Sequence, residues 1–256
     1  MTVAATSTAR AIAIDWSRVA APQTDGYDRA AVRGAMRERW GWEPNRQLPD
    51  GLGSFGPGCG YSQATEVEIL AVLAALDLWP DGRAMVASTV DVATYWRSTE
   101  PGGVGCSCGH WQPPETGGAT VVFTTVGDPI GGAEGLVHEA GHLRLHALGV
   151  DLEAHDGRLL ANAPDELHVS PIRKDKLRPM SAVLQAQYSY VWVTALDLAV
   201  GDAATEHLSV NLPRVITGRA TIERGARWTP AGAEWWGGLC RWMDDVFEDG
   251  RRRLSA

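Results

Sequence analysis

The stretch from Ala119 to Leu148, ATVVFTTVGDPIGGAEGLVHEAGHLRLHAL, decides the fold of this chain. Its first part is rich in β-branched side chains and predicts a strand over Ala119–Val126. Glycines and a proline at positions 127–132 break that pattern. Glu134–Leu148 then has the composition of a helix, which Gly149 ends. The segment therefore predicts a strand, a turn and a helix in succession.

The predicted helix carries His138-Glu139-Ala140-Gly141-His142, an H-E-x-x-H pattern. Residues four apart share a helix face, so the two imidazoles can bind one metal ion from the same side. Glu139 lies about 100° around the helix from His138, where it can act as a base or hold a bound water. A chance match is the alternative. Two unpaired histidines would, however, be costly to bury in an otherwise apolar helix, and a helical glycine at position 141 indicates a close approach.

A third metal ligand has to come from outside this motif. His146 is about 80° around the helix from His138. A straight helix cannot easily bring side chains from three successive turns to one small ion. Leu145 and Leu148 occupy the positions where a metzincin has its Gly and third His, which excludes that class. Eight other residues remain open: Glu153, His155, Asp156, Asp165, Glu166, His168, Gln185 and Glu206.

Two further groups of residues have competing interpretations. Cys106, Cys108 and His110 are an incomplete zinc pattern, and we favour free thiols in a loop. The chain has eleven tryptophans and three phenylalanines. We expect most tryptophans to fill a helical core, although some could line a groove for a bulky substrate, namely Trp40, Trp42, Trp96, Trp111, Trp235 and Trp236.

The remaining pattern predicts mostly helices. Helical segments are expected at Asp28–Trp40, at Thr65–Leu78, at Ser181–Val200, at Ala203–Gly225 with a break near Pro213, and at Pro230–Leu254 with a basic end. Thr65 is the expected N-cap of the second of these, and Pro80-Asp81-Gly82 its end. Residues 41–60 and 99–118 are expected loops, and 150–180 an irregular segment. Ala84–Trp96 fits a strand or a helix.

We therefore expect an α+β fold, a mostly α-helical single domain over 1–256 with a small sheet. A zincin-like strand–turn–helix would form the metal site. Its parts would be an N-terminal region with Gly/Pro-rich loops (1–130), the metal and co-substrate site (131–200) and C-terminal helices (201–256).

Charge and composition limit the classes of function. The formal net charge is -8 and the pI near 5.4. Such a surface repels phosphate backbones and anionic lipids, so neither nucleic acid nor a membrane is an expected partner. The first ten residues lack the basic start and apolar core of a secretory signal, and four cysteines do not make a disulfide framework. We expect a cytoplasmic protein.

Two later segments follow the motif in a recognisable order. One is Ser170-Pro171-Ile172-Arg173-Lys174-Asp175 with Arg178-Pro179 after it, and the other is AVLQAQYSY over 182–190. With the H-E-x-x-H, residues 135–200 resemble the H-E-x-x-H family of 2-oxoglutarate-dependent peptide β-hydroxylases from peptide natural-product pathways. The chain departs from the family at Ile172, where Trp is usual, at Leu177, an apparent insertion, and at Ala182 and Ala186, which replace glycines.

The resemblance implies Fe(II) held by His138, His142 and a third group, with open positions for 2-oxoglutarate and O₂. Gln185 matches the family's Gln or His and is the third ligand or lies next to one. Arg173 and Arg178 match two arginines, either of which can bind the distal carboxylate of 2-oxoglutarate. Tyr188 also matches, in a pocket-lining or a packing role.

The sequence thus predicts an Fe(II)/2-oxoglutarate-dependent hydroxylase that acts on a β-carbon of an amino-acid residue. The substrate is expected to be a peptide, or else a free or carrier-bound amino acid. The first alternative is a zinc peptidase, with Zn(II) in place of iron and Glu139 as the general base. The second is a non-catalytic peptide-binding scaffold, against which the intact motif argues.

Overall fold

The computed structural model describes residues 61–63, 66–90, 92–98, 107–110, 120–125, 127–147, 150, 152, 157–172 and 177–256. Within these ranges, only the backbone is described for residues 61–63, 66, 92–98, 108–110, 120, 122–125 and 146–147. The chain divides into two compact units. Of the described residues, those up to 143 belong to the N-terminal unit and those from 144 onward to the C-terminal unit. The division falls near the end of the helix that carries the H-E-x-x-H motif.

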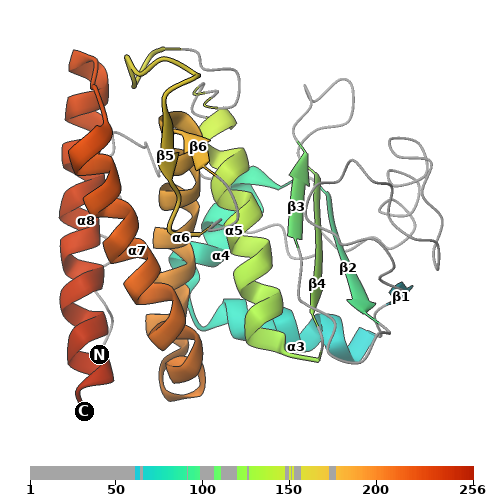
Figure 1. The fold of residues 1–256 in the computed structure, drawn as a ribbon. Coiled ribbons are helices and arrows are strands. Elements are labelled where there is room, and N and C mark those ends of the chain that lie inside the picture. Colours follow the sequence, from blue (N-terminus) through green and yellow to red (C-terminus); the bar gives the residue numbers. More distant parts are fainter. Residues whose placement is uncertain are drawn as a thin grey trace. The chain divides into compact units, whose positions relative to one another are not determined.

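The N-terminal unit contains a four-stranded mixed sheet in the order β1-β2-β4-β3 (Figure 1). Its strands are β1 (Tyr61–Gln63), β2 (Val92–Ser98), β3 (Ser107–His110) and β4 (Thr120–Thr125). β2 and β4 are parallel at the centre, while β1 and β3 are antiparallel edge strands. β4 lies in the segment predicted to be a strand and leads into α5 (Pro129–Ala147), which runs back alongside the sheet (Figure 1).

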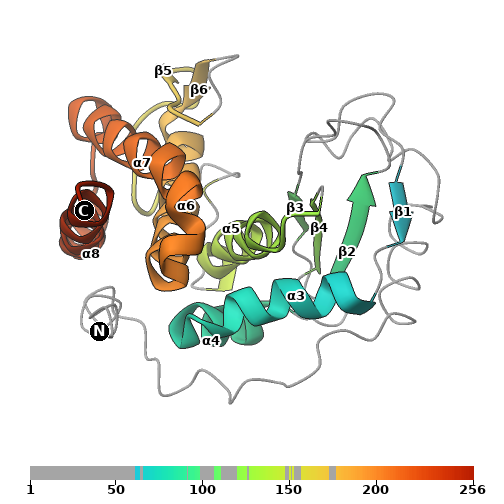
Figure 2. The same cartoon turned by 90° about the horizontal axis from the view of Figure 1, so that it is seen from below.

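Two short helices precede the central strands of this unit (Figure 2). α3 (Glu66–Asp77) buries one face through Ile69, Val72 and Leu76. α4 (Pro80–Thr89) starts directly at the Pro80 that was expected only to end a helix, because proline suits the first turn of a helix. Its end at Thr89 and the start of β2 at Val92 divide the ambiguous segment between a helix and a strand.

The C-terminal unit is a layer of long helices that pack against one another. Its members are α6 (Met180–Val200), the 3-10 turn η4 (Gly201–Ala204), α7 (Thr205–Gly225) and α8 (Pro230–Leu254). They are visible as the orange and red ribbons of Figure 1. α6 is buried along nearly its whole length, as expected of a helix that contacts both α7 and α8. Of the helices that the structure describes, none has the length and apolar composition needed to cross a bilayer.

Aromatic side chains fill the core between these helices. Trp192 and Trp242 are 1% exposed, and their ring centroids lie 4.7 Å apart in an edge-to-face arrangement. Trp236 is also buried and stacks on Trp228. The expectation that tryptophan fills a helical core is confirmed for these buried residues. The predictions for Trp40, Trp42, Trp96 and Trp111 concern side chains outside the described part of the chain.

A segment before α6 is anchored on the α7–α8 connection. Leu160 forms an isolated β-bridge with Trp228, and the Thr229 amide donates to the Leu159 carbonyl at 3.1 Å. A Cβ on Gly232 would lie only 1.9 Å from the same carbonyl oxygen, so only glycine fits there. The segment continues into β5 (Leu167–Val169), which pairs antiparallel with β6 (Leu177–Pro179).

Several boundaries differ from the sequence-based expectation. β3 lies within residues 99–118, which were predicted to be a loop. The prediction was wrong here because this short strand is stabilised by pairing with β4, which no local sequence pattern indicates. β5 and β6 likewise lie in a segment expected to be irregular. α7 continues through Pro213 without a break, since burial of Leu212 and Val215 offsets the one lost hydrogen bond. The helix predicted at Asp28–Trp40 and the Thr65 cap lie outside the described residues.

The coarse fold expectation is confirmed. The described chain is mostly helical with small sheets, as an α+β fold requires. That residues 1–256 form a single domain stays a prediction.

Candidate metal centre

The H-E-x-x-H helix begins earlier than the sequence pattern indicated. Gly127 adopts a φ of 90°, a conformation that favours glycine, and turns the chain at the end of β4. Asp128 then accepts a hydrogen bond from the Ile130 amide at 3.0 Å through its side chain, and Pro129 is the first helical residue. This start places Gly131 and Gly132 inside α5 and corrects the prediction that they break the structure before Glu134.

His138 and His142 face each other on α5. Their Nε2 atoms lie 3.0 Å apart, and the two rings are nearly perpendicular, with centroids 4.5 Å apart. Both residues are partly buried, whereas Val137 and Leu143 beside them are buried. Helix periodicity brings the two rings to one face, and burial restricts them there.

The protonation state of His138 suits a metal ligand. Loss of solvent around the imidazole lowers the pKa of His138 to about 4, and Glu134, one turn earlier, opposes this shift. The ring is therefore neutral at pH 7. A metal ion binds only the neutral imidazole, so binding at this position requires no proton release from His138 near neutral pH.

Glu139 is buried beside the histidine pair. The residue is 6% exposed, and its Oε1 lies 3.8 Å from His138 Nε2. The Ser107 hydroxyl donates a hydrogen bond of 2.7 Å to the same oxygen. Ser107 is the first residue of β3, so the sheet as well as the helix fixes the carboxylate. No sequence signal pointed to Ser107, because the two residues are 32 positions apart.

The histidine pair fits a shared metal ion. The Nε2 atoms lie 3.0 Å apart, at hydrogen-bond distance from each other. Both nitrogens are on one side of the helix, where one ion would be held by His138 and His142. The donor set of two imidazoles with an adjacent carboxylate suits iron or zinc.

Among the described side chains, no group of three or more His, Cys, Asp or Glu residues has the arrangement of a metal site. Of the eight open third-ligand candidates, Asp165 and Glu206 are exposed, and His168 packs against Gly225. Glu153, His155 and Asp156 lie outside the described residues, and so does the side chain of His146.

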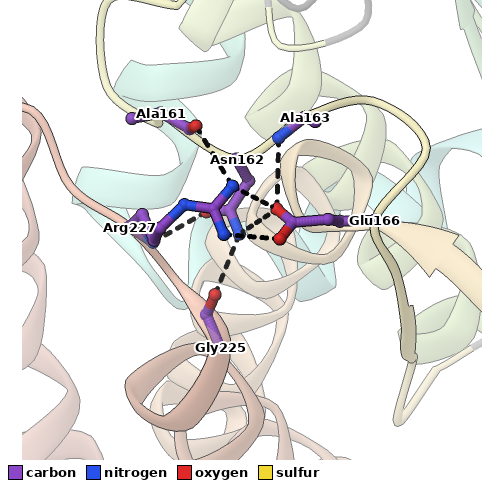
Figure 3. A network of polar contacts seen from close by, with 6 residues as sticks. All are labelled: Ala161, Asn162, Ala163, Glu166, Gly225 and Arg227. Carbon is purple, nitrogen blue, oxygen red and sulfur yellow. Dashed lines mark hydrogen bonds and ion pairs between the residues drawn. The ribbon is translucent and has the colours of Figure 1, made fainter.

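Glu166, another candidate, is already bound by protein groups (Figure 3). Its two carboxylate oxygens accept hydrogen bonds from Arg227 at 2.5 and 2.6 Å. Asn162 bonds to Glu166 Oε2 and to the Gly225 carbonyl, and its own Oδ1 accepts from the Arg227 amide. The Arg227 guanidinium lowers the pKa of Glu166. A carboxylate held in this way is a poor candidate for a metal ligand.

Gln185 is buried in α6, where it forms a polar stripe with Ser181 and Ser189 at intervals of four residues. Polar side chains buried in an otherwise apolar helix imply specific polar partners. Gln185 belongs to the C-terminal unit and the histidine pair to the N-terminal unit. Its assignment as the third ligand stays a prediction.

The residues expected to bind 2-oxoglutarate have different surroundings. Arg178 is half-buried on β6, opposite His168 of β5, while Arg173 lies outside the described residues. Tyr188 is fully buried, and burial raises the pKa of its phenol to about 12. Its ring lies in the aromatic core beside Trp192 and Trp235. Of the two roles expected for Tyr188, this position favours packing.

The cysteine-containing loop contributes a serine to the site. Cys106 and the side chains of Cys108 and His110 are outside the described part of the chain, so the choice between free thiols and a metal site stays open. Ser107, between the two cysteines, is the residue that reaches Glu139.

Comparison of the chain with protein-family models and with curated proteins finds no match. The assignment of a function therefore rests on the residues of the site and on the resemblance that they carry.

Proposed function

We propose that this protein is an Fe(II)/2-oxoglutarate-dependent hydroxylase that acts on the β-carbon of an amino-acid residue in a peptide. The observation that carries the proposal is the convergence of His138 and His142, whose Nε2 atoms lie 3.0 Å apart beside the buried carboxylate of Glu139. Two histidines on one face leave most of the coordination shell of an ion open to co-substrate and O₂.

Each part of the proposed site has a candidate residue. His138 and His142 hold the iron, and Gln185 is the proposed third ligand. Arg173 or Arg178 binds the distal carboxylate of 2-oxoglutarate through its guanidinium fork. Bound iron supplies the chemistry that couples oxidative decarboxylation of 2-oxoglutarate to hydroxylation of a C–H bond.

Iron is favoured over zinc by the resemblance of residues 135–200 to a family that uses iron and 2-oxoglutarate.

A zinc peptidase is the second candidate function. The position of Glu139 favours it, because a buried carboxylate beside the histidine pair is the general base of H-E-x-x-H peptidases. In that case Glu139 would take a proton from zinc-bound water.

The proposal is tested by metal and co-substrate binding under anaerobic conditions. The purified apo protein is loaded with Fe(II), 2-oxoglutarate is added, and we expect a visible charge-transfer band that His138→Ala lacks. On exposure to O₂, the wild type should form succinate in an iron-dependent reaction. Peptide cleavage that a chelator abolishes and zinc restores, without succinate, would instead establish the peptidase.

A further inference from the structure

The contact between Ser107 and Glu139 joins the edge strand of the sheet to the metal-binding helix. The Ser107 hydroxyl lies 2.7 Å from Glu139 Oε1, and the same oxygen is 3.8 Å from His138 Nε2. β3 is held by antiparallel pairing with β4, in which Ser107 lies opposite Phe123. β4 in turn leads into α5, so the donor and the acceptor are both attached to the same short strand–turn–helix unit.

We propose that Ser107 is a positioning residue that holds the Glu139 carboxylate beside the metal-binding histidines. This inference rests on the proposed function, because it requires a metal ion at His138 and His142. A serine hydroxyl has one proton to donate, and an ionised carboxylate only accepts. Ser107 therefore fixes one carboxylate oxygen of Glu139 next to His138.

A free glutamate side chain would not stay in this position without help. It has several rotatable bonds, and fixing them costs conformational entropy. Burial alone restricts Glu139 but does not choose between its oxygens. Partners of this kind around a metal site typically affect metal affinity or activity about 10–100-fold.

The chain allows well-matched variants of this contact. Ser107→Ala removes the hydroxyl, whereas Ser107→Thr keeps it and is at least as compatible with a β-strand. Ser88→Ala is the control in the same unit, because the Ser88 hydroxyl donates to the Met85 carbonyl of its own helix. Glu139→Gln keeps the size of the side chain and removes its charge.

The decisive experiment is a double-mutant cycle on succinate formation from 2-oxoglutarate with iron-loaded protein. We expect Ser107→Ala to lower kcat about 10–100-fold with little change in KM for 2-oxoglutarate, and Ser107→Thr to remain close to wild type. Adding Ser107→Ala to Glu139→Gln should cause no further loss, because the serine acts through the glutamate. Losses that multiply in the double variant would overturn the proposal.

A second readout does not depend on turnover. The visible spectrum of the Co(II)-loaded protein reports the ligands around the ion. Ser107→Ala and Glu139→Gln should change that spectrum in the same way, while Ser107→Thr and Ser88→Ala should not. An unchanged Ser107→Ala spectrum and kcat, in protein with wild-type circular dichroism, would overturn the role of the serine.

The two hypotheses can fail separately. A wild type that binds Co(II) but never forms succinate overturns the oxygenase, and the serine is then judged on the Co(II) spectra alone. A wild type that binds no metal overturns both. A wild type that forms succinate, with a Ser107→Ala variant equal to it, overturns only the serine.

Discussion

The histidine pair of α5 and the network around Glu166 are both polar clusters, but they are assembled in opposite ways. His138 and His142 are four residues apart and meet because one turn of helix separates them. Glu166 and Arg227 are 61 residues apart and meet only when the segment before β5 folds onto the α7–α8 connection (Figure 3). The first cluster can be predicted from the spacing of its residues in the sequence, and the second cannot.

We expect the two clusters to respond differently to mutation. The histidine pair should tolerate small shifts elsewhere in the fold, since its geometry is local. The anchor of the segment 158–166 should depend on long-range packing and contribute to stability rather than to metal binding.

Loss of either histidine should abolish metal binding. We expect His138→Ala and His142→Ala each to weaken Fe(II) or Co(II) binding by more than about 100-fold, because removing a ligand costs more than removing its hydrogen-bond partner. Metal content after dialysis and Co(II) titration measure the effect. His207→Ala, on α7 of the other unit, is the matched control and should bind like wild type. Equal metal content in all three variants would exclude the site.

The contact between α8 and the anchored segment should not tolerate a side chain. In Gly232→Ala the new Cβ would meet the Leu159 carbonyl oxygen at 1.9 Å, so we expect destabilisation of about 3 kcal/mol in urea unfolding. Gly237→Ala in the same helix is the control, with its nearest atom 3.9 Å away. It should be stabilising by about 0.5–1 kcal/mol. Equal behaviour of the two variants would contradict the packing of this segment on α8.

The stability of the metal-free protein should fall in acid because of His138. The pKa of this group drops from 6.5 in the unfolded chain to about 4 in the folded one, so the unfolded state binds more protons between these values. The contribution of His138 to the free energy of unfolding is complete above about pH 6.5 and is lost as the pH falls towards 4. Urea unfolding at pH 7 and pH 5 should show a loss of about 2 kcal/mol that is absent in His138→Gln. Parallel losses in both proteins would disprove the assignment.

The network around Glu166 should make the smallest contribution to the free energy of unfolding. Asn162→Ala removes bonds to Glu166, Gly225 and Arg227, and we expect a loss of about 1–2 kcal/mol in urea unfolding. Glu166→Gln should cost less, and its effect should shrink at high salt because the ion pair is exposed. Neither variant should change Co(II) affinity. A loss of metal binding in Asn162→Ala would show that the two clusters are coupled.

Elements with strong local patterns were predicted well. The strand before the motif, the long helix at Ser181–Val200 and the last helix at Pro230–Leu254 agree with β4, α6 and α8. The start of α5 was missed because Asp128 and Pro129 form a helix start that outweighs the two glycines behind them. Short strands such as β3 and β5 were missed because their signal lies in the strands with which they pair.

The site was predicted unevenly for the same reason. His138, Glu139 and His142 follow from spacing alone. Ser107 was missed because a contact across 32 residues has no local signature. Glu166 was a plausible ligand on sequence grounds, and only the folded chain pairs it with Arg227. Tyr188 had two expected roles, and its burial among tryptophans favours one of them.

The sequence by itself determined that His138 and His142 lie together, because helix periodicity converts a spacing of four into a shared face. It also determined that most of the described chain is helical. The tertiary structure alone decided which carboxylates are engaged by partners, which serine reaches Glu139 and where glycine is required. Those properties depend on contacts between distant segments, and such contacts form only when the whole chain packs to bury its apolar surface.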